Sequence, residues 1–299
     1  MIRCKNFSRR KFLKTGIASC AVSSAAQHPV LAAPKKPGEV RVLFLFGDYW
    51  HNEETQERHW RQVLGSTGWR LMFAQSNQFV TPDVLDNADL FVVCRYGGAE
   101  WQGWSGEGIV ETRLPCAPWM TDEQEESIIE NVKRGMGLLP YHCAIYNGDK
   151  KRYMELLGVR RPIVHGNIRE MTTFCDMNQN HPITRGVEPF EEFDEIFDAE
   201  FLDVDYEILF RVKQVFPKLD KPYTFMQHFP ELIELSKTGA HLDRPGGWTR
   251  EVGEGRVVYL NCGSTPEVFW RKSMKEMMWR AAHWAMKKDI PPSQVVEGL

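Results

Sequence analysis

The chain has 299 residues, of which 42% are hydrophobic and 26% charged, enough for one large or two small packed domains. This composition excludes a disordered, collagen-like or coiled-coil protein. Six of the 37 basic residues and none of the 40 acidic residues lie within positions 1–33, so the remainder carries a formal charge of −9. Such an acidic body argues against a nucleic-acid partner, because Lys and Arg supply that affinity. A neutral or cationic small molecule is the better expectation.

The first 33 residues have the features of an export signal. Two consecutive arginines, Arg9 and Arg10, precede a Phe-Leu pair, and a weakly apolar stretch leads to small residues at Ala32 and Ala33. The segment resembles a bacterial twin-arginine signal, which predicts cleavage near its end and a periplasmic or secreted mature chain of residues 34–299. An amphipathic first helix is the alternative, although the stretch lacks helical apolar periodicity. No other segment predicts a membrane span.

The cysteines do not form a recognisable framework. Cys20 ends an Ile-Ala-Ser-Cys box that makes lipoprotein anchoring a second alternative, but the apolar run before it is very short. The five cysteines after the leader are odd in number, irregular in spacing and without a Cys-x-x-Cys pair, so we expect mostly buried apolar residues rather than disulfides or a cysteine zinc site. They are Cys94, Cys116, Cys143, Cys175 and Cys262.

Short apolar runs alternate with amphipathic segments in the first half of the mature chain. Thr121 begins a capping box, and Gly135 ends the helix that follows it. This alternation predicts an α/β fold, a flavodoxin-like parallel sheet with helices on both faces and added loop insertions. The predicted strands cover 40–46, 69–74, 90–94 and 136–141, and a further helix covers 52–64.

The remaining segments are less regular. Residues 95–120 hold three tryptophans, five glycines and two prolines directly after a strand, which predicts a lid or substrate-lining loop. Residues 214–247 are rich in Pro, Phe, His and Lys and are interpreted as an insertion. A Gly-Glu-Gly turn within 248–260 predicts a hairpin. Thr265, followed by proline, is expected to cap the last helix. Without internal repeats, residues 34–299 are best interpreted as one domain.

Polar and aromatic side chains follow the first and fourth predicted strands. In open parallel sheets ligands bind beyond the carboxyl ends of the strands, so two histidines at neighbouring strand ends can meet one ligand, as proton acceptor and as donor or metal ligand. The alternative is that each histidine only caps a helix or bonds a loop. The candidates are Asp48, Trp50, His51 and Asn52 after the first strand, and Tyr141, His142 and Cys143 at the fourth.

Cys143 and a group of carboxylates extend this candidate site. Cys143 occupies the place of a nucleophile elbow but lacks the flanking glycines that such a turn requires, so a cysteine hydrolase remains a minor hypothesis. Acidic and apolar residues alternate over 193–201, which favours Glu195 and Glu200 as carboxylates facing a site, with a merely acidic surface as the alternative for Asp194 and Asp198. No His-x-x-x-His spacing occurs, which leaves a divalent metal open rather than predicted.

Taken in order, these pieces resemble the ThuA-like (trehalose utilisation) family from about residue 40 to 285. The resemblance implies a class I glutamine amidotransferase-like fold without the amidotransferase cysteine, with His142 at or beside its place. It also implies a role in sugar catabolism, as isomerisation, elimination or hydrolysis of a keto-sugar, rather than glutamine hydrolysis. One departure is Ser264, where many relatives carry histidine. The matching segments are 51–52, 137–142, 181–186, 194–197, 248–259 and 282–285.

The resulting hypothesis is an exported keto-sugar enzyme, with no nucleic-acid partner and with homo-oligomerisation left open. His142 is assigned as general base, Glu195 as its partner acid or base, and His51 as a second proton group; the same three residues are the candidates for holding a metal. A non-catalytic carbohydrate-binding protein is the alternative. Trp50, Tyr141 and Trp248 are expected to stack on a sugar, Arg250 to hold hydroxyls or a carboxylate, and the other expected contacts are Asp48, Asn52, Cys143, Glu200 and Ser264.

Overall fold

A computed structural model describes residues 33–48, 51–74, 76–97, 104–105, 108–109, 119–147, 150–163, 170–221 and 230–298. The predicted leader, Trp50, Cys116 and most of the predicted loop at 95–120 lie outside the described residues. Within the described part of the chain, none of the helices has the length and apolarity needed to cross a bilayer.

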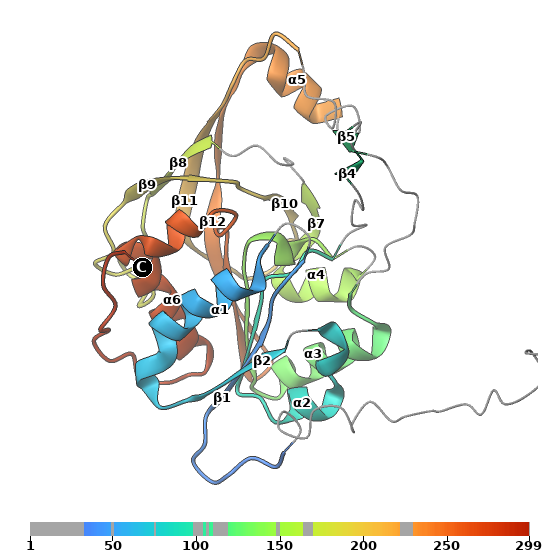
Figure 1. Ribbon diagram of the computed structural model, residues 1–299, viewed down its shortest axis with the longest axis vertical. Coiled ribbons are helices and arrows are strands. Elements are labelled where there is room, and N and C mark those ends of the chain that lie inside the picture. Colours follow the sequence, from blue (N-terminus) through green and yellow to red (C-terminus); the bar gives the residue numbers. More distant parts are fainter. Residues whose placement is uncertain are drawn as a thin grey trace, which may run out of the picture.

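A mixed sheet of nine strands organises the described residues (Figure 1). Its first five strands are parallel and follow the 2-1-3-4-5 order of flavodoxin-like folds, and the other four are antiparallel. In spatial order they are β2 (Arg70–Ala74), β1 (Arg41–Leu45), β3 (Leu90–Val93), β6 (Gly137–Pro140), β13 (Gly255–Leu260), β12 (Ala240–Val252), β11 (Glu207–Phe216), β8 (Glu170–Cys175) and β9 (Phe190–Asp194).

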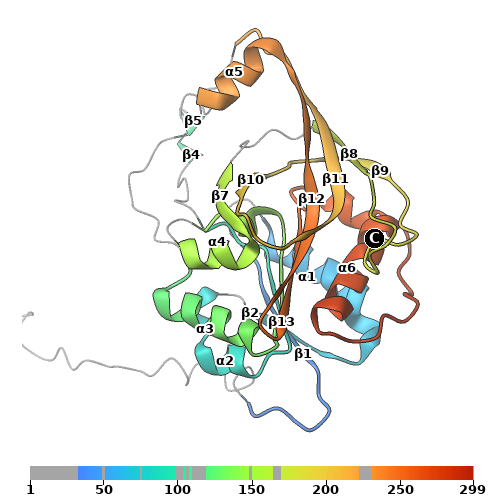
Figure 2. The same ribbon diagram turned by 180° about the vertical axis from the view of Figure 1, so that it is seen from behind.

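Helices cover both faces of the parallel half. Figures 1 and 2 show α1 and α6 together on one side and α2, α3 and α4 on the other, which confirms the predicted α/β architecture. The helices are α1 (Glu53–Leu64), α2 (Pro82–Asp86), α3 (Asp122–Lys133), α4 (Lys151–Leu157), α5 (Pro230–Thr238) and α6 (Lys272–Ala285). Short 3₁₀ turns are η2 (Gly65–Thr67), η3 (Asn77–Phe79), η4 (His142–Ile145) and η6 (Pro266–Trp270), and two small ribbons pair β7 (Val159–Ile163) with β10 (Asp198–Phe201) and β4 (Trp104–Ser105) with β5 (Gly108–Ile109).

Local sequence signals account for the parallel half. Every residue of β1, β3 and β6 is buried, as their continuous apolar runs predict for strands covered on both faces. Asn52 caps α1 by accepting the Thr55 amide at 2.9 Å. Thr121 and Gln124 exchange both hydrogen bonds of the predicted capping box at the start of α3. These elements bring the loops after β1, β3 and β6 to one edge of the sheet.

The second half adds detail to one prediction and contradicts another. Within the predicted insertion at 214–247, the described residues include the end of β11 and the start of β12, which form an antiparallel arm in which Gln214 pairs with Leu242, and α5 lies at its tip. Thr265 does not cap the last helix, because its hydroxyl donates to the Phe193 carbonyl at 2.5 Å. The chain therefore forms η6, extends at Arg271 and only then enters α6. The hairpin of β12 and β13 is confirmed.

Candidate functional site

The candidate site lies at the carboxyl ends of the parallel strands. Asp48 and His51 follow β1, His142 and Cys143 follow β6, and Ser264 follows β13. The rings of His51 and His142 meet edge to face, with centroids 4.8 Å apart. The structure therefore brings together the two histidines that the sequence placed at separate strand ends.

Asp48 fixes the position of the His51 ring. Its two carboxylate oxygens lie 2.8 and 2.9 Å from Nδ1 of His51, and the same carboxylate accepts the backbone amides of His51 at 2.9 Å and Tyr96 at 2.7 Å. Burial lowers the pKa of His51, but the hydrogen bond to Asp48 and the nearby negative charges outweigh it and raise that pKa to about 9. Nε2 is thus the ring nitrogen not engaged with Asp48.

His142 occupies a strained and enclosed position. Its φ of 49° lies in the left-handed region, which non-glycine residues rarely adopt outside functional sites. The Tyr259 hydroxyl donates to the His142 carbonyl at 2.8 Å, and Phe197 packs edge-on against the ring at 4.8 Å. Nε2 of the fully buried ring lies 3.9 Å from Oε2 of Glu195. This places an imidazole beside a carboxylate in a water-poor environment.

Glu195 is held between two anchors. The neighbouring Asp194 carboxylate accepts the amides of Gly263 at 2.9 Å, Ser264 at 2.8 Å and Thr265 at 3.3 Å. On the other side Oδ1 of Asn261 accepts the Phe197 amide at 2.9 Å. These bonds fix the loop after β9, which carries Glu195, against the loop after β13, which carries Ser264. The Ser264 hydroxyl donates to Glu195 at 3.3 Å.

Asp194 is buried, contrary to the alternative of a solvated acidic surface. It has 0% exposure, and its burial raises the pKa of the carboxyl group to about 7 even though its amide donors lower it. Asp198 also departs from that alternative, because its half-buried carboxylate pairs with Arg244. Asp194 is thus an internal support for Glu195 and Ser264.

Cys143 is buried in contact with His51 and Asp48. Its Sγ is 3.5 Å from Nδ1 of His51, 3.6 Å from Oδ2 of Asp48 and 3.8 Å from Sγ of Cys94. Burial raises the pKa of Cys143 well above its usual value, and the side chain has no exposed surface. Both features disfavour the thiolate that a hydrolytic nucleophile requires.

The groups that could hold a metal differ from those expected. Among the described residues, one set of three such side chains converges, with ligand atoms within 4.8 Å of one another: Asp48, His51 and Cys143. His51, His142 and Glu195 do not converge in this way, although all three belong to the site.

Several predicted contacts lie away from this cluster. Tyr141 and Trp248 are only 1% and 2% exposed, so neither offers a face for a sugar; the Tyr141 hydroxyl donates to Gln56 at 2.5 Å, and the Trp248 indole donates to the Leu157 carbonyl at 2.9 Å. The Asn52 side chain is used as the cap of α1. These three side chains have structural roles, which corrects the sequence interpretation.

The two charged residues predicted to bind substrate are also elsewhere. Glu200 lies on β10 with its carboxylate on the surface, paired with Arg160 at 3.2 Å and Arg161 at 2.8 Å. Arg250 on β12 is opposite Val257 in the strand register, near the amino end of β13 and away from the carboxyl end where the cluster lies. Its guanidinium donates to the carbonyls of Glu155, Leu156 and Asp205. Neither residue joins the cluster.

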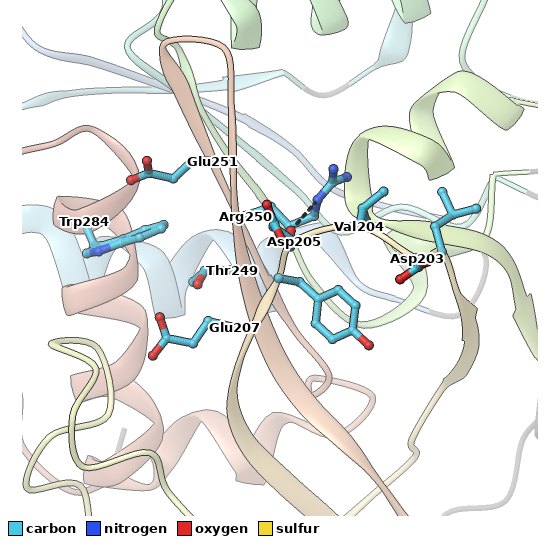
Figure 3. Close-up of a pocket in the computed structure, with 10 residues that line it drawn as sticks. Asp203, Val204, Asp205, Glu207, Thr249, Arg250, Glu251 and Trp284 are labelled. Carbon is cyan, nitrogen blue, oxygen red and sulfur yellow. Dashed lines mark hydrogen bonds between the residues drawn. The ribbon is translucent and has the colours of Figure 1, made fainter.

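A wide surface hollow surrounds Arg250 rather than the histidines. It has a volume of about 750 Å³ and lies between the strands β11 and β12 and the helix α6 (Figure 3). Its lining includes Glu207, Glu251 and Trp284. Arg250 is the one residue of the lining that the sequence analysis had predicted as a site residue. The hollow and the cluster are therefore separate features.

Sequence reasoning missed three contributors to the cluster. Tyr96 and Cys94 directly follow β3, the strand between β1 and β6, and this position was the available signal. Cys94 was interpreted only as a buried apolar residue and Tyr96 as part of a loop. Asp194 carried no local signal, because its partners lie about 70 residues further along the chain.

The sequence and the fold both resemble those of known proteins. Residues 41–285 match the model of a protein family described as "ThuA: Trehalose utilisation". A ThuA-like protein from Parabacteroides merdae shares 16% identity, covers 85% of this chain and 92% of its own, and superposes with a TM-score of 0.57. A ThuA-like protein from Bacteroides uniformis, also at 16% identity, covers 86% and 96% with a TM-score of 0.55. No curated protein matches the chain.

Proposed function

Because the chain belongs to the ThuA family, described as trehalose utilisation, we propose that it acts in carbohydrate catabolism by moving protons on a keto-sugar or keto-glycoside. The reaction classes are isomerisation, elimination and hydrolysis. The observation that carries the proposal is the buried pair of His142 and Glu195, 3.9 Å apart, against which the His51 ring is packed. Binding a neutral sugar does not require such a cluster.

Proton abstraction next to a ketone needs a base and a group that stabilises the enolate oxygen. Because the His142 ring has no exposed surface, Glu195, which is 7% exposed, is the group proposed to remove the proton from the carbon beside the carbonyl. His142, 3.9 Å from that carboxylate, takes the proton over, and Glu195 stabilises the imidazolium that forms. His51, held through Nδ1 by Asp48, presents Nε2 to the carbonyl oxygen. Ser264, bonded to Glu195, is proposed to contact a substrate hydroxyl.

A non-catalytic carbohydrate-binding protein is the second candidate. Ser264 favours it, because many relatives carry histidine at this position and serine is a far weaker proton carrier. The cysteine hydrolase is disfavoured by the burial of Cys143. The remaining histidines and Glu195 are sufficient for general acid–base chemistry, and the enzyme is therefore the preferred proposal.

We also infer export through the twin-arginine pathway, with the mature chain beginning near residue 34. The support is the sequence of the leader alone, with its consecutive arginines Arg9 and Arg10. Replacement of both arginines by lysine should retain the uncleaved precursor inside the cell. An unchanged amount of processed protein outside the cytoplasm would contradict this inference.

The proposed function is tested by product analysis. The purified protein is incubated with 3-keto-glycosides and with the corresponding parent glycosides, and products are identified by mass spectrometry and NMR. Conversion of keto-glycosides alone is expected, because the parent sugars lack the carbonyl that acidifies the neighbouring C–H bond. Saturable binding of the keto-glycosides without conversion of any of them would instead support the carbohydrate-binding protein.

A further inference from the structure

Three side chains of types that commonly ligate transition metals converge within the candidate site. Asp48 and His51 follow β1 and Cys143 follows β6, so two separate strand ends supply the set. The side chains of Asp48 and Cys143 have no exposed surface, and that of His51 is 5% exposed. Burying a thiol, an imidazole and a carboxylate is costly unless they are paired, and these three side chains are paired with one another.

The spacing of the donor atoms resembles the edges of a tetrahedral zinc site. With Zn–S of about 2.3 Å and Zn–N or Zn–O of about 2.0 to 2.1 Å, tetrahedral geometry requires about 3.5 Å from sulfur to each lighter ligand. Sγ of Cys143 lies 3.5 Å from Nδ1 of His51 and 3.6 Å from Oδ2 of Asp48. The remaining edge, from Oδ2 of Asp48 to Nδ1 of His51, is 2.9 Å and would open to about 3.3 Å around a metal.

A second sulfur, also buried, lies close to Cys143. Sγ of Cys94, at the end of β3, is 3.8 Å from Sγ of Cys143, which is also the separation of about 3.8 Å expected for two sulfurs on one zinc ion. Cys94 is not among the three side chains that converge within 4.8 Å, so a turn of its side chain would be needed for it to complete the coordination.

The Asp48 carboxylate is already oriented by two backbone amides. The backbone amides of His51 and Tyr96 donate to the two oxygens of Asp48 at 2.9 and 2.7 Å. Such supporting hydrogen bonds are typical of metal sites, because they fix the direction of the ligand. In a chain without metal they also serve the Asp48–His51 hydrogen bond, which is the competing explanation.

We propose that Asp48, His51 and Cys143 bind a soft divalent transition metal, with Zn²⁺ as the type ion. The metal replaces the proton between Nδ1 of His51 and Asp48, and that proton and the proton of the Cys143 thiol are both released to solvent as the Zn–N and Zn–S bonds form. One thiolate and one carboxylate then balance the two positive charges of the ion. This neutral arrangement removes the cost of a buried uncompensated charge.

The proposal does not depend on the identity of the sugar, and its test therefore measures metal binding without turnover. The purified protein is stripped with chelator and titrated with Zn²⁺ and with Co²⁺, and the bound metal is counted by elemental analysis. One ion per chain is expected, with a thiolate-to-cobalt charge-transfer band in the near ultraviolet. Failure of the wild-type protein to retain one equivalent of either ion after gel filtration would overturn the proposal.

Variants locate the ion. Cys143→Ser is expected to remove the charge-transfer band and to weaken Zn²⁺ binding at least 100-fold, since it removes a direct ligand, whereas Cys175→Ser on β8 should leave both unchanged. If Cys143→Ser folds poorly, X-ray absorption of the zinc-loaded wild-type protein replaces it, with a sulfur shell at about 2.3 Å expected. A Cys143→Ser protein that keeps the band, or a zinc spectrum without sulfur, would contradict the site.

Discussion

The two ends of β13 differ in the surroundings of their polar side chains. At its carboxyl end His51, His142 and Glu195 are 6%, 0% and 7% exposed and are held by short contacts to one another and to fixed backbone groups. Near its amino end a hollow of about 750 Å³ is lined by solvent-facing carboxylates such as Glu207 and Glu251 (Figure 3). The hollow is open to solvent, and its carboxylates are exposed. The polar groups of the cluster are instead buried and held in fixed positions.

For this reason the proposed chemistry is assigned to the converging buried groups rather than to the hollow. A charge–charge interaction is far stronger when water is excluded, so groups fixed inside the protein can stabilise a developing charge that exposed groups cannot. Substitutions at the carboxyl end of β13 are therefore expected to change kcat or the free energy of unfolding, whereas a matched substitution at the amino end is expected to leave kcat unchanged.

The largest expected effect is on turnover. Glu195→Gln and His142→Asn should each lower kcat on a keto-glycoside at least 100-fold, because each removes a proton-transfer group. Asparagine is chosen for residue 142 because it tolerates the positive φ found there. Steady-state kinetics measure the loss. Glu207→Gln in the hollow is the matched control and should retain wild-type kcat; an equal loss in that variant would erase the contrast.

The second effect is on the support beneath Glu195. Asp194→Asn leaves at least one of the buried amides of Gly263, Ser264 and Thr265 with a poor acceptor or opposed by the new NH₂ group. The free energy of unfolding should fall by about 2 to 3 kcal/mol, as measured by urea denaturation. Stability equal to that of the wild type would show that Asp194 does not fix the loop after β13.

A smaller effect separates core aromatics from substrate contacts. Tyr141→Phe removes the hydroxyl that bonds Gln56 and Trp60, and should lower the free energy of unfolding by about 1 to 2 kcal/mol. KM for a keto-glycoside should stay at its wild-type value, because the ring is only 1% exposed. A raised KM with unchanged stability would return Tyr141 to the substrate face.

The smallest expected effect is on the pH dependence of stability, and it concerns a residue away from both ends of β13. His59 on α1 packs against Phe269, and its burial lowers the pKa of its imidazole to about 4 from an ordinary 6.5. The unfolded chain therefore takes up a proton first, so stability present above pH 6.5 is lost as the pH falls toward 4. Urea denaturation at pH 7 and pH 6 should show a decrease of about 0.7 kcal/mol more for the wild type than for His59→Leu. Equal decreases would contradict this role.

Local patterns in the sequence were sufficient for the parallel half of the fold. Continuous apolar runs predicted β1, β3 and β6, because strands buried on both faces need them, and Thr121 marked the start of α3. The antiparallel arm of β11 and β12 was not predicted, since its half-exposed strands carry mixed side chains whose pairing depends on distant partners.

The candidate site was predictable only in part. His51 and His142 were found because they follow strands, and parallel strands deliver such residues to one edge. Tyr141 and Trp248 were misplaced, because an aromatic residue near a site looks the same in sequence whether its ring faces the core or a ligand. Asp194 and Cys94 were missed because their partners come from other strands.

The most direct test of the account is solvent exchange at the carbon beside the ketone. The protein is incubated with a 3-keto-glycoside in D₂O, and deuterium at that carbon is followed by NMR, which detects proton abstraction even where no product accumulates. The account predicts enzyme-dependent incorporation of deuterium by the wild type and at least a 100-fold slower rate in Glu195→Gln. A wild-type protein that binds the keto-glycoside but exchanges no faster than buffer would contradict the proposed proton-transfer chemistry.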